Sequence, residues 1–120
     1  MGTFSVTIEV GDPQGQQFEQ IETLVDTGAV TTMVPGSMLR RLGVAPSKSE
    51  LFEYAGGERV ELNMAETKIR VGDRETTSWV IFGEEGTGAL LGSYTLEGLL
   101  LGVDPYAQCL IPVRGPLPLK

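Results

Sequence analysis

Alternating apolar and polar residues run along much of this chain and predict a series of short β-strands. From Thr3 to Val10 every second residue is apolar, and this period of two indicates a half-buried strand. Other runs rich in apolar or β-branched residues, most of them separated by glycine, proline or aspartate, predict further strands over residues 18–25, 30–34, 51–54, 60–64, 78–82, 89–91 and 108–113.

Two short helices are expected to interrupt the strands. Pro35 suits the first position of a helix and Gly43 suits the position after its last turn, so a helix is expected between them. Ser93 is suited to cap a second helix that ends near Leu99. Many short strands, two short helices and no strand–helix–strand spacing predict a mainly β domain of barrel or sandwich type.

Glycine and proline mark the turns and the end of the domain. The predicted strands over 51–54 and 60–64 form a hairpin whose tip, Ala55-Gly56-Gly57, is almost free of side chains. The loop over 83–88 has three glycines but also two carboxylates and no lysine, so a phosphate-binding loop is not favoured. Prolines in the last residues predict an extended or disordered tail, giving a domain over 1–114 and a Pro-rich tail over 115–120.

The chain contains no histidine and a single cysteine, Cys109. Without histidine, Ser-His and Cys-His nucleophilic catalysis is excluded, together with nearly all zinc and iron sites. A lone cysteine excludes an intramolecular disulfide and fits a reducing compartment, and its apolar neighbours predict that it is buried. Any chemistry must therefore come from carboxylates, Lys, Tyr, hydroxyls or backbone groups, and neither a metal nor a cofactor is expected.

The charge balance argues against polyanionic partners. Sixteen acidic residues against nine basic ones give a net charge of −7, which disfavours binding to nucleic acid or to an anionic membrane surface. No apolar stretch reaches the length of a membrane span, and the first residues lack the basic and apolar pattern of a signal peptide. These observations predict a cytoplasmic location.

One aspartate stands apart from the other three. Asp12 and Asp104 precede proline and Asp73 follows glycine, so a role in turns explains all three. Asp26 instead follows the apolar pair Leu24-Val25, where an unpaired carboxylate is costly. The structural alternative is an Asx turn, in which the side chain of Asp26 accepts hydrogen bonds from the backbone just after it.

The order of motifs resembles that of the retropepsin-like aspartic peptidases, the single-domain members of clan AA. The shared features are Leu24-Val25-Asp26-Thr27-Gly28-Ala29, glycines at a hairpin tip (Gly56-Gly57), and Leu90-Leu91-Gly92 before a second short helix. The resemblance covers nearly the whole chain. It implies a closed β-barrel or sandwich with a flap hairpin and one or two short helices.

Two positions depart from the viral pattern of that family. Viral members usually carry an acid soon after the Asp-Thr-Gly-Ala motif, paired with an arginine that follows the second glycine. This chain has Val30 and Ser93 at those places. Because both partners are missing together, no charge is left unpaired, and the departure favours a non-viral branch of the family.

The resemblance implies a mechanism that one chain cannot complete. Hydrolysis of a peptide bond by this route needs two carboxylates around one water, and two such groups in contact share a proton. A chain with a single Asp-Thr-Gly motif must therefore form a homodimer that brings two copies of Asp26 together. The implied catalytic motif is Asp26, Thr27 and Gly28.

The same resemblance implies how an extended peptide or protein substrate is held. Thr27 bonds to the loop of the partner, Gly28 lets the backbone approach closely, and the small Ala29 leaves room for the substrate. The hairpin tip at Ala55, Gly56 and Gly57 opens, closes and presents backbone N–H groups. For Phe52 and Tyr54, beside the tip, core packing competes with a role in lining pockets.

Two other functions remain open at this point. The first is a non-catalytic module that has the same dimeric fold and binds a peptide or protein without cutting it. The second is an unrelated β-barrel in which Asp-Thr-Gly is only a turn. A cleavage screen separates the first from a peptidase, and the position of Asp26 in the fold tests the second.

Overall fold

The computed structural model describes residues 3–54 and 56–113, which form nine strands and two short helices. The predicted tail over 115–120 lies outside the described residues. In chain order the elements are β1 (Phe4–Gly11), β2 (Phe18–Val25), β3 (Thr32–Pro35), α1 (Gly36–Arg41), β4 (Lys48–Glu53), β5 (Arg59–Val71), β6 (Arg74–Gly83), β7 (Leu90–Leu91), α2 (Ser93–Leu99), β8 (Leu101–Asp104) and β9 (Cys109–Pro112).

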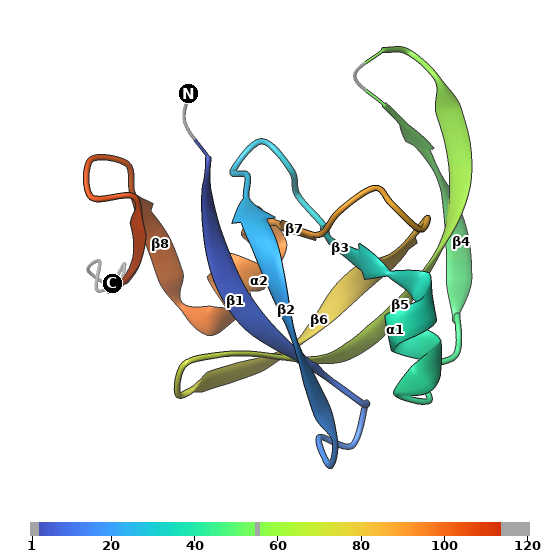
Figure 1. The fold of residues 1–120 in the computed structure, drawn as a ribbon, viewed down its shortest axis with the longest axis horizontal. Helices are drawn as coiled ribbons and strands as arrows, with labels where there is room; N and C mark the ends of the chain where they lie inside the picture. The colour runs from blue at the N-terminus through green and yellow to red at the C-terminus, as the bar shows by residue number, and fades with distance from the viewer. Residues whose placement is uncertain (1–2, 55, 114–120) are drawn as a thin grey trace, which may run out of the picture.

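Seven strands form one sheet that closes on itself (Figure 1). The strand order is β1-β2-β7-β3-β6-β5-β4, and a further pairing of β1 with β5 joins the two sides through Glu9 opposite Arg70 and Val10 opposite Ile69. Closure removes most exposed strand edges. The predicted mainly β barrel with a hairpin and two short helices is confirmed.

The barrel encloses an apolar core to which both helices contribute. Its fully buried side chains include Ile8, Val10, Leu39, Ile69 and Leu91, which come from three strands and from α1. A smaller cluster of Leu62, Met64 and Ile81 lies under the β4–β5 hairpin, with Met33, Phe52 and Trp79 packed against it. The apolar positions of the sequence thus divide between a closed core and a second, more open apolar surface.

The β4–β5 hairpin, called the flap from here on, extends beyond the rest of the sheet (Figure 1, green). It is longer than predicted, because β4 already begins at Lys48 and β5 runs without a break to Val71. From Met64 onward β5 also pairs with β6, whereas residues 59–63 pair only with β4. The outer part of the flap is therefore a two-stranded ribbon.

Both helix starts differ by one residue from the sequence prediction. Pro35 precedes α1 as its N-cap, with an extended ψ of 132°, because it is also the last residue of β3. Gly92, and not Ser93, occupies the N-cap position of α2. Gly43 follows the end of α1 with a φ of +79°, as its predicted role after the last turn requires.

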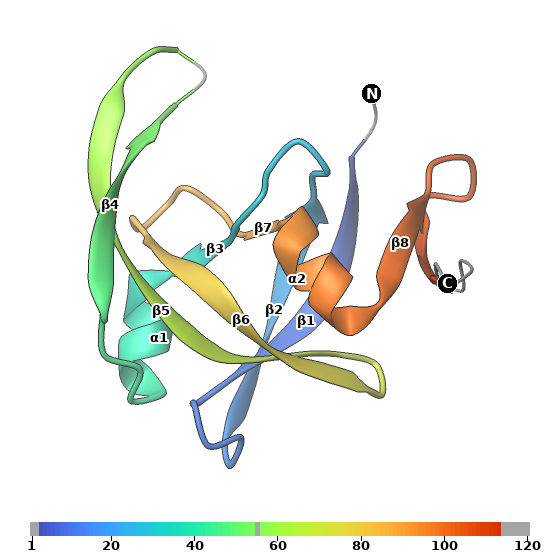
Figure 2. The same ribbon diagram turned by 180° about the vertical axis from the view of Figure 1, so that it is seen from behind.

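The end of the described chain contains a hairpin that the sequence pattern did not reveal. Strands β8 and β9 form a separate two-stranded sheet beside the barrel (Figure 2). The prediction that Cys109 is buried is wrong: the side chain is exposed, because β9 pairs only with β8 and lies outside the barrel. No helix among the described residues is long and apolar enough to cross a membrane.

Candidate active site

Asp26 lies directly after β2, and pairing with β7 holds the end of that strand in place. The two-residue β7 pairs in parallel with β2 and antiparallel with β3, so it separates the strands on either side of the Asp26 loop. The N–H of Asp26 donates to the carbonyl of Leu91 at 3.3 Å, and Leu24 donates to Ala89 at 3.0 Å. The preceding residue, Val25, is buried in the core, whereas Asp26 is only half-buried.

The loop after Asp26 turns around one of its carboxylate oxygens. The N–H of Gly28 donates to Oδ1 of Asp26 at 2.9 Å, and the N–H of Ala29 donates to its carbonyl at 3.0 Å. A Cβ atom at position 28 would lie 3.2 Å from Oδ1, so a glycine keeps the carboxylate uncrowded. The predicted Asx turn is therefore present, and because it uses Oδ1 it leaves Oδ2 for another partner.

The start of α2 holds the other end of this loop. The N–H groups of Ser93 and Tyr94 donate to the carbonyls of Ala29 and Val30, each at 2.9 Å. This contact brings Gly92 so close that a Cβ atom there would lie 2.6 Å from the carbonyl oxygen of Val30. The Asp26 loop is thus bonded to β7 on one side and to α2 on the other.

Three buried hydroxyl groups connect the same elements from inside. Thr95 of α2 shares hydrogen bonds with Thr32 of β3 at 2.6 Å and with Ser78 of β6 at 2.8 Å. Thr32 Oγ1 also accepts the N–H of Gly92 at 3.0 Å, and all three side chains are at most 1% exposed. Sequence reasoning missed this network. The only signal for it was the presence of hydroxyl residues at positions where strand and helix periodicity places the core.

We expect Thr95→Val to destabilise the protein by about 1–3 kcal/mol, because it removes the buried hydroxyl that bonds to both Thr32 and Ser78. Urea denaturation followed by circular dichroism measures the change. The matched control is Thr77→Val on the exposed face of β6, expected to change stability by about 0.5 kcal/mol or less. Equal effects of the two variants would contradict a structural role of the network.

An apolar cavity of about 350 Å³ lies between the Asp26 loop and the flap. Ala29, Val30 and Thr31 line one side, and Phe52, Glu53 and Tyr54 of the flap line the other. Its remaining lining residues are Met33, Leu62, Ile81 and Leu90. The structure therefore places Phe52 and Tyr54 in a pocket wall, and Ala29 faces the same space.

The family of this chain follows from its sequence. The family model described as "gag-polyprotein putative aspartyl protease" matches residues 15–98, which span the Asp26 loop, the flap and most of α2. The chain belongs to this family.

A solved structure supports the same fold. The solution structure of the Simian Foamy Virus (mac) protease is 18% identical in sequence and superposes with a TM-score of 0.56. The match covers 78% of this chain and 92% of that protease. No curated protein sequence matches this chain. The retropepsin-like fold is thus shown, whereas the assignment to a non-viral branch stays a prediction.

In this member of the aspartyl protease family, the predicted flap glycines lie away from Asp26. Gly56 and Gly57 are exposed at the tip of the flap, and the described residues that line the apolar cavity do not include them. Gly57 has a φ of +91°, and its N–H donates to the carbonyl of Tyr54 at 2.8 Å. Ala55, also predicted to bind substrate, lies outside the described residues.

The hydroxyl of Tyr54 bonds to a loop of the barrel. It donates to Oε1 of Glu84, in the β6–β7 loop, at 3.2 Å. Partial desolvation raises the pKa of Tyr54 above its usual value, and the hydrogen bond to the Glu84 carboxylate raises it further. The phenol therefore remains protonated and able to donate across the neutral pH range.

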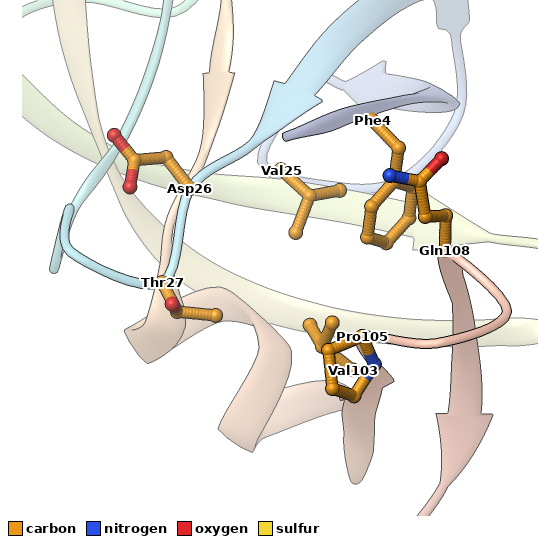
Figure 3. A pocket seen from close by; sticks show the side chains of 7 residues that line it. All are labelled: Phe4, Val25, Asp26, Thr27, Val103, Pro105 and Gln108. Carbon is orange, nitrogen blue, oxygen red and sulfur yellow. The ribbon is translucent and has the colours of Figure 1, made fainter. Parts of the chain in front are cut away.

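Thr27 faces a second, smaller cavity on the other side of the Asp26 loop. This space of about 90 Å³ is lined by Asp26 and Thr27, by Phe4 and Val25, and by three residues of the β8–β9 hairpin: Val103, Pro105 and Gln108 (Figure 3). In Figure 3 the carboxylate of Asp26 points away from the apolar side chains of this cavity. Asp26 and Thr27 thus line the cavity beside the hairpin, whereas Ala29 and the two residues after it line the cavity under the flap.

The polar groups of this site are a carboxylate, hydroxyls and backbone groups. Within residues 3–54 and 56–113, no group of three acidic or cysteine side chains is arranged to hold a metal ion. Asp26 is the one aspartate of this loop, and its neighbours supply hydroxyl and backbone groups. What the arrangement can do chemically depends on a carboxylate acting as acid or base.

Proposed function

We propose that this protein is an aspartic endopeptidase that hydrolyses peptide bonds in extended substrates. One observation carries the proposal: a half-buried Asp26 sits on a loop, fixed by β7 and α2, whose next residues line an apolar cavity beneath the flap. A carboxylate at the edge of an apolar groove suits a reaction in which water attacks a bound peptide.

The proposed reaction uses two Asp26 carboxylates and one water. The ionised carboxylate accepts a proton from the water as the water oxygen attacks the peptide carbonyl carbon. The protonated carboxyl group gives its proton to the carbonyl oxygen, and the carbonyl carbon becomes the centre of a tetrahedral intermediate. The C–N bond then breaks as the leaving nitrogen takes the proton that the first carboxylate accepted from the water, and one hydroxyl of the intermediate returns its proton to the second carboxylate. Neither a metal nor a cofactor takes part.

The second carboxylate requires a homodimer, because each chain has a single Asp-Thr-Gly motif. A two-fold axis beside Asp26 places Thr27 and the smaller cavity near the contact between subunits. The turn of the β8–β9 hairpin and the start of β1 lie at the same end of the molecule (Figure 1). The hairpin carries exposed apolar side chains at Tyr106, Ile111 and Val113, which are 97%, 40% and 52% exposed.

If this surface forms the dimer, Tyr106→Asp will weaken association by roughly 30-fold or more, as expected when an aromatic anchor of an interface is lost. Sedimentation over a range of micromolar concentrations measures the dissociation constant. Gln20→Asp, which adds the same charge on the exposed face of β2, is the control and should leave association unchanged. A wild-type chain that stays monomeric throughout would contradict the dimer itself.

A peptide-library cleavage screen over acidic to neutral pH tests the proposed activity. The cavity under the flap favours peptides with a large apolar side chain near the cleaved bond. Binding of such peptides without cleavage would instead support the non-catalytic module, which the loss of the acid–arginine pair at Val30 and Ser93 slightly favours.

A further inference from the structure

The outer part of the flap is not held in position by strand pairing with the barrel. Residues 49–53 of β4 pair with 59–63 of β5, and residues 59–63 have no second strand beside them. A two-stranded ribbon alone is marginally stable in water. Contacts between its side chains and the barrel must therefore decide where this ribbon rests.

Two kinds of contact join the outer flap to the barrel. Phe52 and Leu62 are part of the apolar cluster with Met33 and Ile81 on the floor of the cavity. Beyond them, the hydroxyl of Tyr54 donates to Glu84, 30 residues further along the chain. Apolar packing tolerates sliding, whereas a hydrogen bond to a carboxylate fixes both distance and direction.

The loop that carries the acceptor, Glu84, has its own hydrogen bonds and contacts. The carbonyl of Glu84 accepts hydrogen bonds from the backbone N–H of Thr87 at 3.3 Å and from its hydroxyl at 2.7 Å. The neighbouring Glu85 accepts the hydroxyl of Ser37, in α1, at 2.8 Å. The residue before Glu84 is Gly83, which lies close to Met33 of β3. A Cβ atom at position 83 would be 2.9 Å from Cγ of Met33. A turn within the loop thus holds the backbone of Glu84, and its two neighbours contact α1 and β3.

We propose that Tyr54 is a positioning residue whose hydrogen bond to Glu84 holds the outer flap over the apolar cavity. This bond fixes the Tyr54 ring as a wall of the substrate pocket. The part of this inference that concerns substrate rests on the proposed function. The part that concerns the resting position of the flap does not.

Loss of the bond has a defined consequence for substrate. The closed flap becomes a smaller fraction of the population, and apparent affinity falls by the same factor. Because the hydroxyl of Tyr54 bonds to Glu84 and acts through the position of the flap, the chemical step is unaffected once the flap has closed. KM should rise while kcat stays nearly constant.

The test compares Tyr54→Phe and Glu84→Ala with two matched variants. Tyr54→Phe keeps the ring and removes the hydroxyl, whereas Glu84→Gln keeps an oxygen that can accept the bond. Glu58→Ala removes an exposed carboxylate from the flap and leaves both partners in place. Backbone amide exchange over 50–54 and 59–62 without substrate reports the position of the flap, and peptide hydrolysis reports KM and kcat.

We expect exchange to accelerate about five-fold in Tyr54→Phe and Glu84→Ala, with a similar rise in KM. Glu84→Gln and Glu58→Ala should stay within about two-fold of the wild type in both measurements. Unchanged exchange in Tyr54→Phe, or faster exchange with unchanged KM, would overturn the proposal. Faster exchange in a protein that cleaves no peptide would instead reject the peptidase function and leave the role of Tyr54 in flap position standing.

Discussion

Asp26→Asn should abolish peptide cleavage while leaving the fold and the dimer intact. An amide can neither accept the proton of the attacking water nor supply one to the carbonyl oxygen, so the rate should fall by about 10³-fold or more. The N–H of Gly28 can still donate to the amide oxygen at position 26, so the turn survives. Hydrolysis of a library-selected peptide, with sedimentation of the same sample, measures both outcomes.

Asp12→Asn is the matched control for this variant. The backbone N–H of Gln17 and that of Gln16 donate to Oδ1 of Asp12, and these bonds lower the pKa of Asp12 below its usual value. Its carboxylate has a complete role in the β1–β2 turn, so its loss should leave hydrolysis unchanged. Activity that persists in Asp26→Asn, or disappears equally in both variants, would reject Asp26 as the catalytic group.

Gly92→Ala should have the largest effect on stability, about 2–4 kcal/mol. The added methyl group would lie 2.6 Å from the carbonyl oxygen of Val30 and 2.7 Å from the carbonyl carbon of Thr31. These are backbone atoms, so no side chain can rotate away to make room. Either α2 must move off the Asp26 loop or the loop must shift, and urea denaturation measures the cost.

Gly56→Ala provides the comparison, because a Cβ atom at position 56 meets nothing within 4 Å. Its effect on stability should be within about 0.5 kcal/mol. If Gly92→Ala were equally mild, the contact between α2 and the Asp26 loop would be more adaptable than the structure indicates.

Local patterns in the sequence predicted most strands and the special position of Asp26. The alternation over 3–10 matches β1 closely, because this strand has one face in the core and one toward solvent. The strand predicted over 18–25 has the same bounds as β2. Asp26 was distinguishable from Asp12, Asp73 and Asp104 by its neighbours alone. The turn roles of Asp12 and Asp104 are confirmed by their bonds to backbone N–H groups just after them.

What the sequence could not predict depends on contacts between distant residues. Thr32 and Thr95 are 63 positions apart, and Tyr54 and Glu84 are 30 apart, so no local period brings either pair together. Strand β8 was missed because its four residues include a glycine and show no alternation of exposed and buried positions. Cys109 was misjudged because apolar neighbours indicate burial only where a second layer covers the strand.

Because β7 lies far along the chain from Asp26, the site can form only after β7 has been synthesised and has paired with β2. Asp26 leaves the ribosome long before residues 89–95, yet those residues supply Leu91, Gly92 and the start of α2 that shape its loop. Pairings between positions so far apart form late, because the intervening chain must first be closed into a loop. A nascent or truncated chain that ends before β7 would contain the aspartate without its loop geometry. The proposed peptidase activity would therefore arise only after nearly the whole barrel has been made.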